Sequence, residues 1–488
     1  MGPEEGKAVG ADSTPVAAVV VLAAGSGTRM RSKTSKLLHT VGGHSMLSWA
    51  VGAADAVNPH HLCVVVGHAR EEVTAHLGEV APHATTALQA EQNGTGHAVQ
   101  CALTELGELD GEVVVTYGDV PLLSGETLQS LILGHREAGN AVTVLTAQNP
   151  NPTGYGRIVR DAAGEVERIV EQKDASDDEL AITEINSGIY VFDGRVLADG
   201  LARITSDNAQ AELYLTDVLG IARGDGRRVG THVVDDLWQT EGVNDRVQLA
   251  RMDAEINRRI CERWMRSGVT IVSPESVRID RDVDLAQDVT LLPGTHLQGA
   301  TTVASGATIG PETTLTDVEV GAGATITRAV GSLAVVGEGA TVGPFAYLRP
   351  GTRMAAGAKI GTFVESKNSV IGEGAKVPHL TYAGDADIEA GANIGAGTIF
   401  ANYDGVAKHR THVGRDTFVG SNSVLVAPVD LADGSYVAAG SAVTENLGPG
   451  DLAVARGRQR NIPGWVAKQR PGTPTAASAE AAEPIGKE

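Results

Sequence analysis

The chain has 488 residues, with 39 basic and 60 acidic side chains and a formal net charge of −21. Such a surface repels nucleic acid and anionic membranes, so we expect neither nucleic-acid binding nor membrane insertion. The length exceeds one hydrophobic core and predicts two or three domains. Three cysteines without metal-type spacing indicate a reducing compartment. Since the start lacks a signal-peptide pattern, we expect a cytoplasmic protein.

The first apolar stretch leads into a glycine-rich turn. Residues 17–22 form a continuous run of Ala, Val and Leu, which favours a strand covered on both faces in a parallel sheet. Gly25 and Gly27 follow, and then the cations Arg29 and Lys36. The backbone N–H groups of such a turn can hold phosphate. The turn lacks the third glycine of a dinucleotide site and the Gly-Lys-Ser/Thr of a P-loop, so alone it is weak support for nucleotide binding.

Further alternation of strands and helices predicts a doubly wound sheet. One expected strand, residues 113–117, ends at Gly118-Asp119. Ligands of such sheets lie at the carboxyl ends of the strands, which makes Asp119 either a metal ligand or a helix cap. Two more glycine-rich stretches, residues 89–96 and 153–157, could line the same crevice.

Apolar residues with three- and four-residue spacings between residues 244 and 268 predict an amphipathic helix that joins two domains. Beyond it an aliphatic residue recurs every six positions, most regularly at Val413, Val419, Leu425, Leu431, Val437 and Val443. Six is not a helical period, and a fixed short period of this kind is typical of a parallel β-helix. The alternative is a glycine-rich β-sandwich, but the five consecutive six-residue steps from Val413 to Val443 argue against it.

The six-residue period is interrupted twice, and we expect function at these breaks. The first lies between Ser366 and Ile388 and contains His379. The second is a polar insertion, residues 401–410, that should project as a loop. Proton transfer at such a site needs a base that titrates near neutral pH, and histidine fits this role. A lone histidine is more often structural, but Lys367 and Tyr382 nearby favour a catalytic His379.

Taken together, these motifs resemble the bacterial family of bifunctional N-acetylglucosamine-1-phosphate uridyltransferases / glucosamine-1-phosphate N-acetyltransferases. The resemblance covers roughly residues 16–465. It rests on residues 22–36, 89–97, 117–119, 154–156, 171, 186 and 242–244, in that order. One departure is Ser35, where a proline often precedes the lysine.

The resemblance implies the fold class and its boundaries. We predict an α/β, Rossmann-like nucleotidyltransferase domain followed by a connecting helix and a left-handed parallel β-helix of hexapeptide repeats. The expected parts are a disordered N-terminus at 1–15, the pyrophosphorylase domain at 16–244, a helical linker at 245–268, the acetyltransferase domain at 269–465 and a disordered tail at 466–488.

For the first domain the resemblance implies a UTP and sugar-phosphate site with magnesium held by Asp119 and Asn244. Arg29 and Lys36 would neutralise the phosphates, which accords with the charge of two anionic reactants. Residues expected at the nucleotide sugar are Leu22, Ala23, Ala24, Gly25, Lys36, Gln89, Gly94, Thr95, Tyr117, Gly118, Asp119, Gly156, Glu171, Asn186 and Asn244. His39 and His97 also lie in matching motifs, and we interpret them as structural.

For the second domain the resemblance implies His379 as the general base, oriented by Glu365. The amino-sugar phosphate is expected at Arg349, Lys367, Tyr382 and Asn393. Acetyl-CoA is expected at Ala396, Asn402, Tyr403, Ser421, Ala439 and Arg456. Members of the family are homotrimers whose acetyl sites are built from adjoining subunits.

The expected function is the synthesis of UDP-N-acetylglucosamine, a precursor of peptidoglycan and other cell-envelope polymers, from UTP, acetyl-CoA and amino-sugar phosphates. One alternative keeps only nucleotidyl transfer and makes the β-helix a scaffold for oligomerisation or regulation. Another is a zinc-dependent carbonic anhydrase, for which His379, His409 and His412 are the histidines in the right region.

Overall fold

The computed structural model describes residues 14–483, which divide into two compact units. The first unit runs to Ser267 and includes Ser273–Val283 and Leu297–Gly299. The second unit comprises Gly268–Val272, Asp284–His296 and the chain from Ala300 on. Apart from Thr14 and Pro15, the predicted disordered N-terminus lies outside the described residues.

The first unit is built on one mixed sheet with the strand order β11-β7-β10-β6-β1-β4-β5. The strands are β1 (Ala18–Ala23), β4 (His61–Val66), β5 (Thr85–Leu88), β6 (Glu112–Tyr117), β7 (Val142–Gln148), β10 (Glu184–Asp193) and β11 (Val229–Val233). β1 is parallel to β4 and β6, whereas β10 runs antiparallel to β6 and β7. The helices are α1 (Met46–Asp55), α2 (Arg70–Val80), α3 (Thr95–Leu106), α4 (Gly125–Ala138), α6 (Gly194–Leu201) and α7 (Asp217–Gly224).

The central strand β1 supplies both cores because successive side chains of a strand point to opposite faces. Val20 packs in a cluster with Val99 of α3 and Val218 of α7. Val21 packs in the other cluster, with Leu47 of α1 and Leu128 of α4. A strand that is apolar at every position therefore lies in the middle of a three-layered α/β unit, as its sequence predicts.

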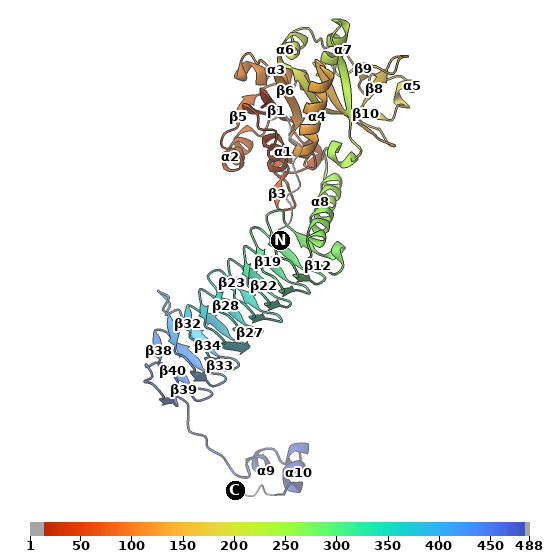
Figure 1. Cartoon of the computed structure of the whole chain (residues 1–488). Coiled ribbons are helices and arrows are strands. Elements are labelled where there is room, and N and C mark those ends of the chain that lie inside the picture. The colour runs from red at the N-terminus through yellow and green to blue at the C-terminus, as the bar shows by residue number, and fades with distance from the viewer. Residues whose placement is uncertain (1–13, 484–488) are drawn as a thin grey trace. The chain divides into compact units, whose positions relative to one another are not determined.

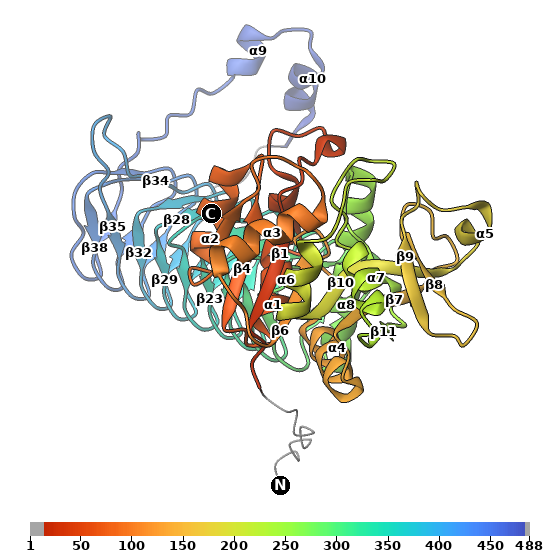
Figure 2. The same ribbon diagram turned by 90° about the horizontal axis from the view of Figure 1, so that it is seen from above.

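Two strands lie off the main path of this sheet. β8 (Gly156–Arg160) pairs antiparallel with β10 and with β9 (Val166–Val170), and the short helix α5 (Asp177–Leu180) follows. Figures 1 and 2 both show β8, β9 and α5 beyond β10, at one side of the unit. The glycine-rich stretch 153–157 therefore reaches the main sheet through β8.

The helix predicted between residues 244 and 268 is α8 (Arg246–Arg266). Asp245 caps its N-terminus by accepting hydrogen bonds from the backbone N–H groups of Val247 and Gln248. Its buried side chains include Ile256 and Ile260. Asp253 accepts a hydrogen bond of 2.9 Å from the N–H of Gly42, in the turn between β2 (Thr40–Val41) and β3 (His44–Ser45), so α8 packs on its own unit.

The second unit is a parallel β-helix with three sheets. The first β-helix sheet contains β12 (Thr270–Ile271), β15 (Thr290–Leu291), β18 (Thr308–Ile309), β21 (Thr325–Ile326), β24 (Thr341–Val342), β27 (Lys359–Thr362), β30 (Lys376–His379), β33 (Asn393–Ile394), β36 (Phe418–Val419), β39 (Tyr436–Val437) and β41 (Leu452–Ala453). The second contains β19 (Thr314–Thr316), β22 (Val330–Ser332), β25 (Tyr347–Leu348), β28 (Glu365–Lys367), β31 (Tyr382–Gly384), β34 (Ile399–Ala401), β37 (Val424–Val426) and β40 (Ala442–Val443).

The third β-helix sheet contains β14 (Asp284–Leu285), β17 (Thr302–Val303), β20 (Glu319–Val320), β23 (Val335–Val336), β26 (Arg353–Met354), β29 (Val370–Ile371), β32 (Ala386–Ile388), β35 (Thr411–Val413) and β38 (Val429–Leu431). Figure 2 shows the coils of this unit stacked side by side. Val342 pairs with Ile360, so one coil holds three six-residue steps. The predicted fold class, with its left-handed β-helix of hexapeptide repeats, is confirmed.

The six-residue period is broken between Ser366 and Ile388, as the sequence indicates, but the coil continues through this segment. β28 to β32 continue the three sheets through it, with Ser366, Ile371, Val377 and Ala383 buried at inward positions. The steps from Ser366 to Ile371 and from Ala383 to Ile388 are five residues long instead of six. Ser366 and Ala383 occupy inward positions where an aliphatic residue is expected. Such small residues fit inside the coil because the hydroxyl group of Ser369 and the Thr352 side chain provide hydrogen bonds there.

The predicted insertion at residues 401–410 is confirmed as a projecting loop. Ile394 pairs directly with Val419, twenty-five residues further on, and Val406 is 92 % exposed. From Trp465 on, the structure forms the short helices α9 (Trp465–Gln469) and α10 (Pro474–Ala481), whereas the sequence predicts a disordered tail at 466–488. Alanine has the highest helix propensity, which accounts for α10. Within residues 14–483, no helix combines the length and apolar character needed to cross a membrane.

Candidate functional site

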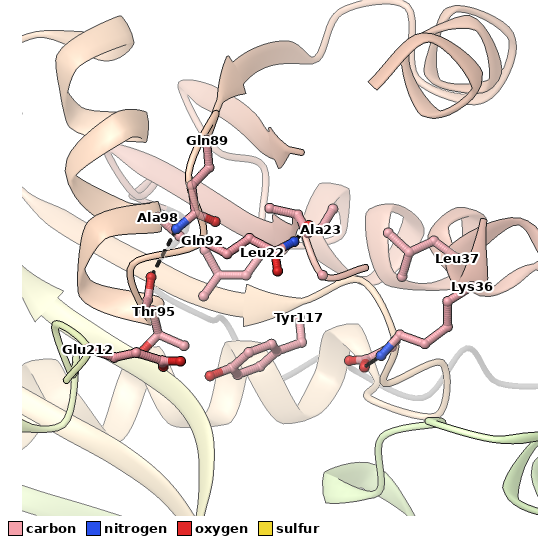
Figure 3. A pocket seen from close by; sticks show the side chains of 14 residues that line it. Leu22, Ala23, Lys36, Leu37, Gln89, Gln92, Thr95, Ala98, Tyr117 and Glu212 are labelled. Carbon is pink, nitrogen blue, oxygen red and sulfur yellow. Dashed lines mark hydrogen bonds and ion pairs between the residues drawn. The ribbon is translucent and has the colours of Figure 1, made fainter. Parts of the chain in front are cut away.

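A cavity of about 300 Å³ opens at the carboxyl ends of β1 and β6 (Figure 3). Its lining includes ten of the residues predicted at the nucleotide, namely Leu22, Ala23, Ala24, Gly25, Lys36, Gln89, Gly94, Thr95, Tyr117 and Asp119. Gly118 lies between the last two and donates its N–H to the carbonyl of Leu22. The predicted crevice at the ends of parallel strands therefore exists and collects segments from five parts of the chain.

A second cavity of about 410 Å³ adjoins the first, because Tyr117 and Asp119 line both. It is also lined by Arg29, Gly154 and Asn244. The two cavities together form one cleft, with Asp119 and Tyr117 in the wall between its two parts. Such a cleft can hold two reactants whose reacting groups meet at the shared wall.

Sequence reasoning missed two polar residues of this cleft. Gln92 donates a 2.7 Å hydrogen bond to the carbonyl of Ala24 and so fixes the glycine-rich turn. Glu212 lines the first cavity from a loop 93 residues after Asp119, the lining residue that is nearest to it in the sequence (Figure 3). Gln92 lies inside the motif 89–96 and could have been found, but no local pattern marks Glu212.

The predicted sugar-contacting residues lie together on β8, β9 and β10. Gly156 pairs with Asn186, and Glu171 follows the last residue of β9. Burial and the carboxylates of Asp174 and Asp217 raise the pKa of Glu171. Burial, together with the negative charges of Glu171 and Asp119, also raises the pKa of Tyr117. Glu171 and Asp119 thus both lie near Tyr117, but Gly156, Glu171 and Asn186 are not among the residues that line the two cavities.

The predicted metal ligands and phosphate-binding cations contact one another. Lys36 Nζ lies 2.5 Å from Asp119 Oδ2 and 3.3 Å from Asn244 Oδ1. Arg29 Nη2 donates to the same Asn244 Oδ1 at 3.0 Å. Two cations and two oxygen-bearing side chains, which come from three distant segments of the chain, therefore meet at the wall shared by the two cavities.

The two histidines interpreted as structural have different surroundings. His97 Nδ1 lies 3.0 Å from the carbonyl oxygen of Glu91 and 3.3 Å from Gln89 Nε2. Burial lowers the pKa of His39, and the nearby Arg246 guanidinium contributes in the same direction. Neither histidine is among the residues that line the two cavities.

In the second unit, predicted sugar-phosphate residues lie along the second β-helix sheet. Arg349 Nη1 donates to Glu365 Oε1 at 2.7 Å, and Glu365 pairs with Tyr382 on the next coil. Asn402, at the start of the insertion, donates to the hydroxyl group of Tyr382 at 3.3 Å and to Asp385 Oδ2 at 2.5 Å. These contacts attach the insertion to the sheet, whereas the ring of Tyr403 is 60 % exposed.

His379 ends β30, at the corner between the first and second β-helix sheets. The same corner on successive coils carries the predicted acetyl-CoA residues Ala396, Ser421 and Ala439. Their carbonyls, like that of His379, accept hydrogen bonds from the following coil. Arg456 donates to the carbonyl of Ala439 at 2.8 Å. The predicted base and four predicted acetyl-CoA contacts therefore lie along one edge, while Asn393 begins β33 beside it.

Glu365, which is predicted to orient His379, is instead paired with Arg349. Among the described residues, no hydrogen bond joins Glu365 to His379, since Glu365 is paired with Arg349. An orienting role of Glu365 therefore stays a prediction.

Sequence reasoning did not select Lys408 of the insertion as a functional residue. Its ammonium group lies beside Lys367 and lowers the pKa of Lys367, and Arg349 contributes in the same direction. Two lysines thus lie side by side on this edge of the coil. Arg349 is also near but is paired with Glu365, and the carboxylate of Asp385 acts on the pKa of Lys367 in the opposite direction. Like charges held this close favour the binding of an anion between them.

The histidines considered for zinc do not come together within this chain. His412 lies on the third β-helix sheet, between Asp387 and Asp430, whereas His379 ends a strand of the first sheet. His409 Nε2 contacts Asp404 at 2.7 Å in the insertion. No cluster of three or more His, Cys, Asp or Glu residues that could hold a metal ion occurs in the part of the chain that the structure describes.

The doubly wound sheet and the cleft at its strand ends define a nucleotidyltransferase in the first unit, and a family model described as a MobA-like NTP transferase domain matches residues 19–180. Over its whole length the chain is similar to bifunctional GlmU proteins. Relatives include those of Streptomyces avermitilis (57 % identity, 96 % of this chain and 97 % of the relative), Corynebacterium efficiens (53 %, 96 % and 97 %) and Rhodococcus opacus (54 %, 96 % and 95 %). The chain belongs to the family of bifunctional GlmU proteins, and the resemblance noted from its motifs is confirmed.

Proposed function

We propose that this protein is a bifunctional enzyme of UDP-N-acetylglucosamine synthesis. Its second unit would acetylate glucosamine-1-phosphate with acetyl-CoA, and its first unit would transfer UMP from UTP to N-acetylglucosamine-1-phosphate with release of pyrophosphate. The observation that carries the proposal is the cluster of Arg29, Lys36, Asp119 and Asn244 between two adjoining cavities.

In uridyl transfer both reactants are anions, so the site must neutralise negative charge rather than move protons. UTP would occupy the first cavity, where Gln89 and the turn at Gly25 line the wall. The sugar phosphate would enter from the side of Gly156, Glu171 and Asn186. Arg29 and Lys36 would stabilise the charge that develops on the departing pyrophosphate.

The donor set of this site fits a magnesium ion. Asp119 offers a carboxylate and Asn244 an amide oxygen, and both lie within hydrogen-bond reach of one ammonium group, so their oxygens converge on one position. Magnesium prefers oxygen ligands and is bound through one or two protein groups plus substrate phosphates and water. The ion would supply Lewis-acid stabilisation of the phosphate oxygens when bound.

In acetyl transfer the amine of the sugar attacks the thioester carbonyl, and the CoA thiol leaves. His379 would accept the proton that the amine loses. Arg349, Lys367 and Tyr382 would hold the sugar phosphate, and the edge from Ala396 to Ala439 would hold acetyl-CoA. Lys367 and Lys408, which lie side by side, support a phosphate-bearing substrate here.

We further propose a homotrimer in which neighbouring copies complete each acetyl site. At the corner that carries His379, the side chains of Phe345, Phe363 and Leu380 are 54 %, 57 % and 60 % exposed, and the two phenylalanine rings stack at 5.4 Å. The outward residues of the third sheet are instead mostly charged, as at Arg353 and Asp387. A contiguous apolar ridge is typical of a surface that another chain covers.

The test is to assay the two half-reactions of the full-length protein separately. Pyrophosphate release is followed with UTP, N-acetylglucosamine-1-phosphate and Mg²⁺. Release of the CoA thiol is followed with acetyl-CoA and glucosamine-1-phosphate. We expect both activities. Pyrophosphate release without thiol release would favour the alternative in which the β-helix is only a scaffold.

A further inference from the structure

We propose that Lys36 competes with the divalent cation for Asp119 and Asn244, so that metal binding is weak until UTP draws Lys36 away. This inference deepens the proposed uridyltransferase site and rests on the metal assignment made there. It concerns how the site is regulated, since it makes the metal and the nucleotide bind cooperatively.

The competition follows from the position of the ammonium group. Lys36 Nζ is 2.5 Å from Asp119 Oδ2 and 3.3 Å from Asn244 Oδ1. A cation that would use these two oxygens as ligands must take the place that Nζ fills. The side chains of Lys36 and Asp119 are only 11 % and 17 % exposed, so water and salt screen the repulsion between the ammonium group and a divalent ion weakly.

Asn244 strengthens the effect because its oxygen is fully engaged. An amide oxygen has two lone pairs, and Oδ1 of Asn244 already accepts from Lys36 and from Arg29, the latter at 3.0 Å. It cannot also coordinate a metal without losing one of these bonds. Asp119 keeps a second oxygen, but a metal held there would still lie beside an ammonium group.

The triphosphate of UTP resolves the conflict. Arg29 and Lys36 are the cations expected to bind phosphate. Phosphate oxygens are stronger partners for Arg29 than the neutral amide of Asn244, and a triphosphate offers Lys36 more negative charge than the single carboxylate of Asp119. When they turn to the triphosphate, both metal-binding side chains become free. The phosphates also supply further ligands to the metal. The metal-free enzyme thus holds an internal cation that substrate binding exchanges for an external one.

The experiment measures Mn²⁺ binding, as a probe of the magnesium site, by calorimetry and by the paramagnetic resonance of free Mn²⁺, on the full-length protein without nucleotide. Four variants are compared with the natural chain. Lys36→Met removes the competing charge and Lys36→Arg keeps it. Lys33→Met is a matched change on the same loop, at a residue that lines neither of the two cavities described above, and Asp119→Ala removes the site.

We expect Lys36→Met to bind Mn²⁺ at least about tenfold more tightly than the natural chain, within the range usual for coupled ligands. Lys36→Arg and Lys33→Met should bind as the natural chain does, and Asp119→Ala should lose the site. Equal or weaker binding by Lys36→Met, with the site still lost in Asp119→Ala, overturns the competition alone. Unchanged binding by Asp119→Ala overturns the metal assignment and the competition together. Circular dichroism checks folding, and Lys36→Gln replaces Lys36→Met if that variant is unfolded.

Discussion

The two candidate sites treat their positive charges in opposite ways. In the first unit, Lys36 is paired with Asp119 in a cleft where both side chains are largely covered. In the second unit, Lys367 lies beside another cation, Lys408, on an open edge. The first site sets Lys36 against a carboxylate, whereas the second holds two lysines side by side, whose mutual repulsion an anion between them would relieve.

The surroundings of the two sites also differ, because the first site is enclosed by its own unit and the second is open. Both cavities of the first unit are lined by segments of that unit alone. The edge of the β-helix is flanked by an exposed apolar ridge, at Phe345, Phe363 and Leu380. A wound sheet can fold loops over its strand ends, but this β-helix offers flat faces and corners apart from the insertion at residues 401–410. Proximity of two reactants on such a surface therefore requires a second surface opposite it.

Of the substitutions that separate the two sites, Asp119→Ala is expected to have the largest effect on activity. This change removes a proposed metal ligand and the partner of Lys36, so we expect uridyl transfer to fall at least about a thousandfold. Acetyl transfer should be unchanged because its residues lie in the other unit. Pyrophosphate release and thiol release measured on the same preparation check both statements. Asp110→Ala, an exposed aspartate elsewhere in the first unit, is the control, and near-normal pyrophosphate release by Asp119→Ala would refute the metal assignment.

The corresponding test of the second site is His379→Ala, which removes the proposed base of acetyl transfer. Loss of a general base lowers the rate by about 10²- to 10⁴-fold, so thiol release should fall by that factor while pyrophosphate release is kept. His412→Ala, on the third β-helix sheet, should leave both activities intact. Acetyl transfer at the natural rate in His379→Ala would exclude this residue as the base.

Phe363→Asp tests whether only the second site needs a neighbouring chain. A carboxylate placed on the apolar ridge would have to be desolvated in an interface, so the trimer should weaken at least tenfold in its dissociation constant. Light scattering after gel filtration measures the mass. Acetyl transfer should fall with the trimer and uridyl transfer should not. Val370→Asp, on the third sheet, is the matched control, and a stable trimer in Phe363→Asp would remove the ridge from the interface.

The smallest predicted effect is that of Lys408→Ala. Removing one charge-assisted contact costs about 1.5–3 kcal/mol, so we expect KM for glucosamine-1-phosphate to rise about tenfold or more. The KM for acetyl-CoA should stay within about twofold, and the pKa of Lys367 should return toward its ordinary value. Arg353→Ala tests an equally exposed cation on the third sheet. If the KM for the sugar phosphate is unchanged, Lys408 does not belong to the phosphate site.

Sequence patterns were sufficient where the physics is local and periodic. Val342 and Ile360 repeat at a fixed interval because each six-residue step must bury one side chain, and the structure buries both. The all-apolar run at residues 17–22 likewise becomes the central strand of the sheet. The pattern failed between Ser366 and Ile388 because side-chain hydrogen bonds, which periodicity does not reveal, allow polar and small residues at inward positions.

By itself the sequence determined the two architectures, the helix that follows the first sheet, and the motifs that place Asp119, Asn244 and His379 in a known family. Only the tertiary structure decided which of these side chains touch. The contact between Lys36 and Asn244 joins positions 208 residues apart. Glu212 enters its site from a loop without any local signal, and the polar insertion that carries Lys408 did not show which of its side chains would reach Lys367. The physical reason is that repeat spacing and strand composition are fixed by neighbours in the chain, whereas charge pairing depends on distances that exist only after folding.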